Sequence, residues 1–408
     1  MGGGWDSNVK ALAAYNAFRG FTVGGFMTLL PMYMKYLGYS MNSIGGIISA
    51  WSIVLSLTLP AIGHLIDTRG SRPVIIGTGL LLIASPLIAM TSGSLWGLGV
   101  AYGFFLFSFL AGQPARMNFL YTSVGALRMG EAVGLTSSLF SASRTVGPMA
   151  AGLMARYYGF KPSFLALALS GSIGLALFIY LSRPVPPAGS GSNVLDAYRY
   201  LIRPPRRLAL VLGYVSMDRF AWSLWFPILS AHLYASGYTE DIVGYILTLS
   251  GVVRTVLMPY MGRLTDRIGA SRALAVSELL GIGTALLYAN PSTITAAATA
   301  STLMGVSLAL WVPAYNALIA RTVGGSGGAY SAANTARSLL GSPAPMAGGY
   351  LYDTVAPWAP FALSSALLVG AALYALLVLA GVESAILVET PEGPRERLVR
   401  PGIETRGR

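Results

Sequence analysis

Long stretches of apolar residues recur along nearly the whole chain and constrain its fold more than any other feature. A helix needs about 20 apolar residues to cross a bilayer. Twelve runs of this kind occur, at residues 9–37, 43–66, 73–91, 94–121, 131–158, 161–182, 207–235, 241–264, 271–290, 293–321, 327–355 and 358–381. Only 10% of the residues are charged, against about 25% in soluble domains. The sequence therefore predicts an all-α membrane protein with twelve transmembrane helices.

The twelve runs divide into two sets of six. Residues 1–182 hold the first set and residues 207–383 the second. Between them, residues 183–206 contain Pro, Gly and Ser breakers and a cluster of arginines, a composition that predicts a linker at the membrane surface. Residues 384–408 follow as a tail. We therefore expect two six-helix bundles, a linker and a tail, and we expect the first helix to be retained because its apolar run is too long for a cleavable signal.

Positive charges are distributed unevenly between the alternating loops. Of the 27 Lys and Arg residues, 18 fall on the side that holds both termini and the linker, and 3 fall on the other side, namely Lys35, Arg156 and Lys161. Short loops rich in Lys and Arg stay in the cytoplasm. The sequence therefore predicts a multi-pass protein of the cytoplasmic membrane with both termini inside the cell. This topology explains most of the net charge of +12, so no nucleic-acid partner is expected.

One short pattern occurs twice, 199 residues apart. Residues 63–72 read GHLIDTRGSR, and residues 262–272 read GRLTDRIGASR. The same offset relates LGYS at 37–40 to SGYT at 236–239. Such a spacing indicates that a six-helix unit is repeated in parallel. Two repeated bundles with a substrate site between them near the bilayer midplane are a common plan for transporters.

The repeated pattern resembles the signature of the major facilitator superfamily, in which Gly is followed by an apolar residue, Asp, a basic residue and Gly-Arg or similar. The matching residues are Gly63, Leu65, Asp67, Arg69, Gly70 and Arg72 in the first copy, and Gly262, Leu264, Asp266, Arg267, Gly269 and Arg272 in the second. The resemblance covers nearly the whole chain. It implies secondary transport of a small molecule by alternating access. It also implies that these loops form a conformational gate that stabilises the outward-facing state.

A second resemblance lies in the fifth run. Gly147-Pro148, with Ala151-Gly152 in place of a later glycine pair, resembles the Gly-Pro motif of the superfamily's antiporters. It implies antiport and a place for Gly147 and Pro148 in the conformational gate, although glycine and proline also kink and thin a helix for packing alone. In the fourth run, Gln113 stands without the Arg that the family's proton-linked motif places earlier. That route of proton coupling is therefore not supported.

Ionisable residues inside the predicted spans are the strongest candidates for a site. They are Arg19, Arg116, Arg144, Arg219, Arg254, Arg337, Asp218 and Glu278. Each costs about 2.5 to 3.5 kcal/mol at the centre of a span, so each needs a polar cavity or a partner. Arg19 and Arg219 occupy near-equivalent places in the repeat, and so do Arg144 and Arg337. We expect these four arginines to bind substrate at one central site.

The balance of these charges inside the spans predicts the charge of the substrate. Six arginines against two acids leave +4, and guanidinium binds carboxylate or phosphate bidentately. The excess predicts an anionic substrate. The alternative is that Asp218 and Glu278 pair internally with some arginines, that Arg116 reaches the cytoplasm, and that water screens the rest. Asn16, Gln113, Asn316 and Trp222 are further candidates for the cavity wall.

Asp218 and Glu278 are also the candidates for proton coupling. Burial favours the protonated form of a carboxyl group, and a neighbouring arginine favours the ionised form. By resemblance the ninth span is peripheral, so a structural salt bridge is the expectation for Glu278, and Asp218 is the preferred coupling residue.

Catalytic and metal chemistry find little support. The chain has 0 Cys and 2 His, so no metal or cofactor is expected. Residues 324–328 formally match G-x-S-x-G but follow no strand, and the loops are too short for an enzyme or receptor domain. We expect a monomer in membrane lipid that transports a small organic or phosphorylated anion. The alternative is a proton-coupled efflux antiporter for multidrug or amphipathic compounds.

Overall fold

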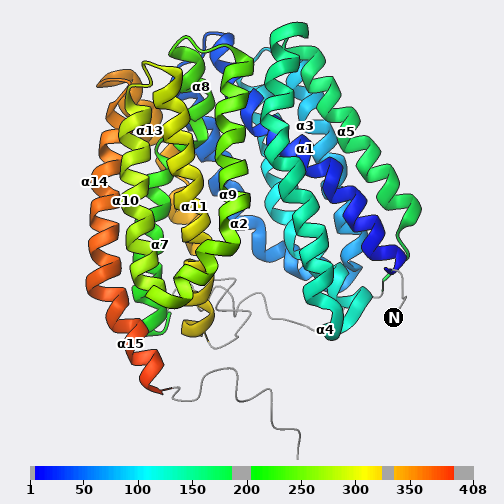
Figure 1. Cartoon of the computed structure of the whole chain (residues 1–408). Coiled ribbons are helices and arrows are strands. Elements are labelled where there is room, and N and C mark those ends of the chain that lie inside the picture. The colour runs from blue at the N-terminus through cyan, green and yellow to red at the C-terminus, as the bar shows by residue number, and fades with distance from the viewer. Residues whose placement is uncertain (1–4, 186–203, 324–334, 390–408) are drawn as a thin grey trace, which may run out of the picture.

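The computed structural model describes residues 5–185, 204–323 and 335–389, and the regular structure within these ranges is helical (Figure 1). Eight of the described helices are long and apolar enough to cross a membrane. The prediction of an all-α membrane protein is confirmed. The linker residues 186–203, the Gly-rich residues 324–334 and the tail from residue 390 lie outside the described residues.

The first bundle contains one helix that crosses the structure twice. The bundle consists of α1 (Ser7–Tyr36), α2 (Met41–Arg69), α3 (Ser71–Thr91), α4 (Leu95–Tyr158) and α5 (Phe160–Leu181). At 1.5 Å per residue, the 64 residues of α4 would span about 96 Å if straight. Both ends of α4 nevertheless lie near the loop after α1, because Tyr39 Oη donates to the Gly93 carbonyl at 2.7 Å and the rings of Tyr36 and Phe160 lie 5.1 Å apart. Helix α4 therefore turns back on itself and joins the predicted spans 94–121 and 131–158 without a break.

The second bundle is more interrupted. Its elements are α7 (Arg206–Ser223), η1 (Phe226–Ile228), α8 (Leu229–Ala235), α9 (Glu240–Ile268), α10 (Ala270–Ala289), α11 (Ile294–Val323), α13 (Ala344–Thr354), α14 (Ala359–Tyr374), η2 (Ala375–Leu379) and α15 (Ala380–Glu389). The predicted span 207–235 is broken after Ser223. Pro227 explains the break, because proline lacks an N–H and its ring clashes with the carbonyl four residues earlier. The last predicted span contains a π-helical turn, η2, and extends to Glu389.

The 199-residue repeat of the sequence is also a repeat of structure. Helix starts that differ by this offset are Ser7 and Arg206, Met41 and Glu240, Ser71 and Ala270, and Leu95 and Ile294. The same offset relates Gly38 to Gly237 and Gly70 to Gly269, and all four have φ between 83° and 94°. Side chains other than glycine rarely adopt that backbone conformation. The repeated glycines therefore set the same turns in both bundles.

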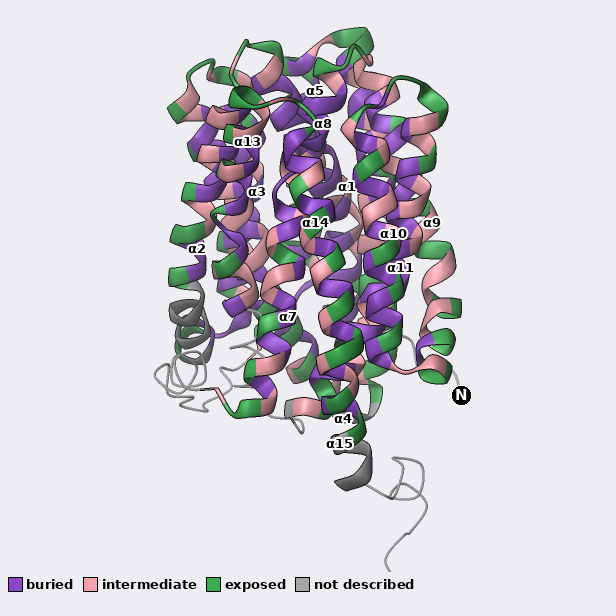
Figure 2. Ribbon diagram, turned by 90° about the vertical axis from the view of Figure 1, so that its left-hand side faces the viewer, coloured by how far each residue is buried: buried purple, intermediate pink, exposed green. Residues whose placement is uncertain are grey.

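Burial fits a protein surrounded by lipid. Helix α1 is central, with 21 of its 30 residues buried, and Figure 2 shows buried residues on the inner faces of the bundles. Large apolar side chains face outward, among them Leu80 at 57%, Leu279 at 59% and Leu377 at 77% exposure. Apolar side chains at such positions are stable against hydrocarbon, because lipid tails need no hydrogen bonds.

The two bundles meet at one end of the molecule. We call this the far end; it holds Gly38, Gly159 and Gly237, whereas the terminus end holds the start of α1, Gly70 and Gly269. In Figure 1 the far end is at the top, and the bundles diverge toward the terminus end. At the far end the backbones of α2 and α13 are so close that a Cβ on Gly45 would lie 2.0 Å from the Pro345 carbonyl oxygen.

Hydrogen bonds join the bundles in this same half of the structure. The Asp353 carboxylate, at the end of α13, accepts from Met41 N at 3.3 Å and Asn42 N at 2.7 Å at the start of α2. Further toward the middle, Ser56 and Ser338 hydroxyls lie 2.9 Å apart. Ser56 lies about midway along α2, so these contacts extend from the far end to the middle of the molecule.

Candidate functional site

A cavity of about 120 Å³ lies between the two bundles. Its lining comes from α1 and α4 on one side and from η1, α8, α9 and α11 on the other: Gly24, Met27, Thr28, Arg144, Thr145, Pro148, Phe226, Pro227, Leu229, Ser230, Leu247, Ser250, Gly251, Arg254, Met304 and Leu308. Most of these side chains are apolar, and Arg144 and Arg254 carry the only charges in the lining. An apolar wall with a few polar groups is typical of a small-molecule site.

Four arginines are grouped at and behind this cavity. Arg144 is an electrostatic neighbour of Arg254 and Arg19, and Arg19 is a neighbour of Arg116. We call Arg19, Arg116, Arg144 and Arg254 the arginine cluster. Only 2% of Arg19 and 7% of Arg116 are exposed. Within the described ranges no acidic side chain forms an ion pair with any of the four, since the ion pairs given there are Arg128–Glu131 and Arg321–Glu383.

Aromatic rings flank the cluster. The Arg19 guanidinium carbon lies 4.5 Å from the ring centroid of Phe140 and 5.8 Å from that of Phe109. Arg144 lies 5.5 Å from the same Phe109 ring. Such contacts attract a cation to the face of the ring and partly replace the water lost on burial. They leave the hydrogen-bond donors of the guanidinium groups unsatisfied, as at Arg19 Nε and Arg116 Nη1.

Two carboxyl groups form a separate centre in the second bundle. Asp218 on α7 and Glu278 on α10 are electrostatic neighbours and are 2% and 0% exposed. The Tyr214 hydroxyl donates to Glu278 Oε1. Arg219 and Arg337 are electrostatic neighbours of Asp218. The carboxyl pair therefore lies beside these two arginines, and no described acidic side chain pairs with the arginine cluster.

The predicted arginines are thus divided between two centres. Arg337 packs on the Trp311 ring at 4.4 Å, and its buried Nε has no hydrogen-bond partner. The Arg219 side chain lies against Gly341, where an added Cβ would be 2.6 Å from its Cγ. No contact described in the structure joins Arg219 to Arg19. The structure places Arg19 and Arg144 in one group, and Arg219 and Arg337 in the other.

The polar and aromatic candidates lie at several places. Asn16 Nδ2 donates to the Thr136 carbonyl at 3.1 Å, a buried contact inside the first bundle. Trp222 lies beside Glu278, whereas Gln113 and Asn316 are exposed. None of the four is part of the cavity lining described above.

Sequence reasoning left most of the cavity wall out of the predicted site. Met27, Thr145, Leu247 and Met304 carried no signal, because apolar and hydroxyl residues are common in every span. Arg254 did carry a signal in the sequence, because it is a charged residue inside a predicted span.

The Gly-Pro motif lies where three helices cross. A Cβ on Gly147 would be 2.7 Å from the Phe21 carbonyl oxygen of α1, and a Cβ on Gly244 of α9 would be 2.5 Å from the Pro148 carbonyl oxygen. Pro148 also lines the cavity. The small residues therefore bring α4 close to its own bundle and to the other one.

The signature loops make no described contact between the bundles. Arg72 bonds to Ser182 Oγ at 2.9 Å and to the Ile179 carbonyl at 3.2 Å, both in its own bundle. Arg69, Asp266, Arg267 and Arg272 are exposed, Gly262 is partly exposed, and the surroundings of Gly63 and the Asp67 side chain lie outside what is described. The gate inferred from these residues stays a prediction, and its contacts are absent from the described part of this conformation.

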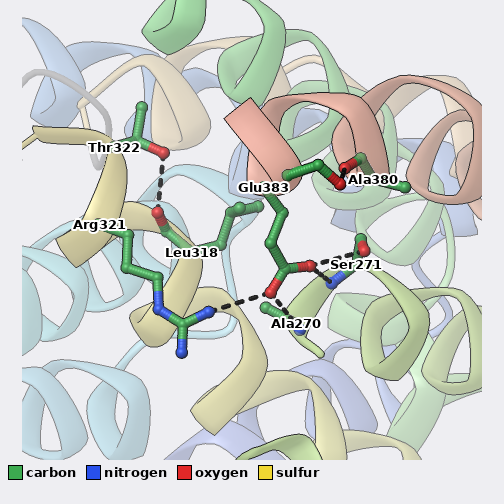
Figure 3. A network of polar contacts seen from close by, with 8 residues as sticks. Ala270, Ser271, Leu318, Arg321, Thr322, Ala380 and Glu383 are labelled. Atoms are coloured by element: carbon green, nitrogen blue, oxygen red, sulfur yellow. Dashed lines mark hydrogen bonds and ion pairs between the residues drawn. The ribbon is translucent and has the colours of Figure 1, made fainter. Parts of the chain in front are cut away.

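The second signature loop is anchored by a residue that the sequence did not single out. The Glu383 carboxylate on α15 accepts from Ala270 N at 2.9 Å, Ser271 N at 3.0 Å and Ser271 Oγ at 2.7 Å, and it pairs with Arg321 Nη1 at 3.0 Å (Figure 3). It thereby satisfies backbone donors at the start of α10, where a negative charge is favourable.

Two repeated helical bundles around a central cavity define a membrane transporter. The family model described as Major Facilitator Superfamily matches residues 12–345 and 215–405. The chain belongs to this superfamily and is therefore a multi-pass secondary transporter of small molecules, not an enzyme.

Similar proteins agree with this family. Multidrug resistance protein 2 of Bacillus subtilis is 23% identical over 349 residues, which are 81% of this chain and 85% of that protein. The multi-drug resistance efflux pump PmrA of Streptococcus pneumoniae is 24% identical, over 78% of this chain and 82% of its own length. A crystal structure of a mutant of the nucleoside transporter NupG has a TM-score of 0.72 at 13% identity and covers 93% of this chain and 99% of its own. This last likeness establishes the fold alone.

Proposed function

We propose that the protein is a proton-coupled antiporter that exports amphipathic, drug-like compounds across the cytoplasmic membrane. The observation that carries the proposal is the cavity between the bundles, because most of its wall is apolar and both bundles contribute to it. A small phosphorylated anion has little apolar surface to bury against such a wall. The names of the multidrug and efflux relatives support the same function, which is the alternative derived from the sequence rather than its leading prediction.

The carboxyl pair is the proposed site of proton exchange. Asp218 and Glu278 are buried neighbours, so two negative charges there would repel each other strongly away from water. The pair therefore holds a shared proton in the conformation described here. Release of that proton needs a change of surroundings, such as entry of water or movement of Arg219 and Arg337. A rocking motion of the bundles supplies such a change.

The proposed topology assigns the conformation described here a place in the export cycle. The uneven loop charges favour a cytoplasmic terminus end, so contact at the far end corresponds to an inward-facing conformation. An exporter loads its substrate in that conformation. Closure at the terminus end then engages the proposed gate, Gly63, Asp67, Arg69 and Arg72 with Gly262, Asp266, Arg267 and Arg272. In the same scheme residues 1–182 and 207–383 move as two bundles of a monomer.

The proposal is tested in proteoliposomes with a matched pair of permanently charged probes, 2-naphthalenesulfonate and trimethyl(2-naphthylmethyl)ammonium. Preloaded vesicles are transferred to acidic buffer, so that inward proton movement drives export. We expect at least one probe to leave faster than from protein-free vesicles, and a proton ionophore to remove the difference. Equal loss of both probes with and without protein would refute the proposal.

A further inference from the structure

We propose that the arginine cluster binds an anionic group of the exported compound, so that the substrate is an amphipathic organic anion. This inference rests on the proposed export function and narrows its substrate class. The cluster combines Arg19, Arg116, Arg144 and Arg254, and differs from the group of four that the sequence predicted.

The charge balance around the cavity favours a negative ligand. The two buried carboxyl groups lie beside Arg219 and Arg337, not beside the cluster. The four cluster arginines form no ion pair with a described acidic residue. A buried cation without a counter-charge is costly, and the cost falls when an anion arrives. The site is therefore electrostatically complementary to a negative group.

Two arginines of the cluster can be reached by a ligand in the cavity. Arg144 and Arg254 both line the cavity, one from α4 of the first bundle and one from α9 of the second. The only hydrogen bond described for the Arg144 guanidinium runs from Nη2 to the Met27 sulfur at 3.8 Å, and a thioether is a weak acceptor. Its other donors are available to a carboxylate, sulfonate or phosphate, which guanidinium binds bidentately.

The apolar part of the cavity wall determines what the rest of the ligand is made of. Beside the two arginines the wall consists of side chains such as Met27, Leu247 and Met304. An inorganic anion would leave this surface unused, whereas an aromatic or aliphatic body buries it and gains hydrophobic free energy. The pairing of a cationic edge with an apolar wall therefore favours an amphipathic anion.

Binding of such a ligand also connects the bundles. Arg144 and Arg254 carry like charges on opposite bundles and repel each other while the cavity is empty of anions. An anion between them converts this repulsion into two attractions. Substrate therefore favours approach of the bundles around the cavity, which is the step that alternating access requires.

The binding test uses the two naphthalene probes with purified protein in dodecylmaltoside. The parent protein is expected to bind 2-naphthalenesulfonate at least tenfold more tightly than the trimethylammonium probe. Arg144→Gln and Arg254→Gln should each weaken sulfonate binding about tenfold or more, since each removes a charge-assisted hydrogen bond. Arg156→Gln is the matched control, because Arg156 is exposed at the far end of α4. Elution as one symmetric peak in gel filtration verifies that each variant is folded.

The outcomes separate this inference from the function it rests on. Tighter binding of the ammonium probe, or unchanged sulfonate affinity in both cavity variants, would overturn the inference. If the proteoliposomes then export the ammonium probe under a proton gradient, the antiporter proposal stands although the inference of an anionic substrate fails. Proton-driven export of the sulfonate that is lost in Arg144→Gln and kept in Arg156→Gln would support both.

Discussion

The carboxyl groups of Asp218 and Glu278 are electrostatic neighbours, although 60 residues separate them in the chain. Asp218 lies on α7 and Glu278 on α10, and each is almost fully buried. The Tyr214 hydroxyl donates to one oxygen of Glu278, and the other oxygen, Oε2, has no hydrogen-bond partner. This arrangement distinguishes the pair from a structural salt bridge, which was the expectation for Glu278.

Asp218→Asn is expected to abolish proton-driven export while exchange of substrate across the membrane persists. The amide cannot release a proton, but exchange needs no net proton movement. Initial rates of 2-naphthalenesulfonate loss under a pH gradient, compared with exchange at equal pH, measure the two activities. Glu131→Gln removes an exposed carboxylate outside the site and serves as control. Full pH-driven export by Asp218→Asn would remove this residue from the coupling role.

Gly45→Ala is expected to shift the protein toward the conformation that is open at the far end. The added methyl group would lie 2.0 Å from the Pro345 carbonyl oxygen, so α2 and α13 must separate. Gly46→Ala is the matched control, because no atom lies within 4 Å of its added Cβ.

The measurement is a spin-label distance between the bundles at the terminus end. The chain has no native cysteine, so labels attached through Arg128→Cys and Arg263→Cys report only that pair. The distance should shorten in Gly45→Ala and stay unchanged in Gly46→Ala. Identical distance distributions for the two alanine variants would show that the close approach does not hold the far end together.

Asp353→Asn is expected to produce a smaller shift in the same direction. The carboxylate of Asp353 accepts from Met41 N and Asn42 N at the start of α2, where a negative charge is worth about 0.3 to 1 kcal/mol. Loss of that charge changes the ratio of the two conformations by at most about fivefold. The same spin-label pair measures it, and a lower ionic strength should enlarge the effect. A distance distribution unchanged at low salt would count against this contact as a latch.

Glu383→Ala is expected to lower thermal stability more than Arg321→Ala. The Glu383 variant leaves two backbone N–H groups at the start of α10 without their acceptor, at a cost of about 1.5 to 3 kcal/mol. Arg321 loses one partly exposed ion pair, which is worth less. Thermal unfolding of the purified variants, with Ser384→Ala as control, compares the two. Equal losses of stability would mean that the ion pair, not the capping of α10, is the main contribution.

The sequence by itself determined the helical spans, the repeat and the turns between helices. These features depend on local physics: an apolar run long enough for a bilayer, and a glycine where the backbone needs positive φ, as at Gly70 and Gly269. Because the sequence repeats, the same apolar runs and turn glycines occur in both halves of the chain. The reversal between the spans 94–121 and 131–158 was foreseen, but the helical form of residues 122–130 was not, because a loop was expected there.

Only the tertiary structure decided which charges are neighbours. The sequence grouped Arg19 with Arg219 by their positions in the repeat, but side-chain contacts depend on the rotation and crossing of helices distant in the chain. Arg19 instead approaches Arg116 and Arg144, and Arg219 lies near Asp218 and Arg337. The anchor formed by Glu383 at residues 270–271 likewise joins groups more than 100 residues apart. Spacing along a helix fixes a residue's depth in the membrane, whereas its partner is fixed by which helix packs beside it.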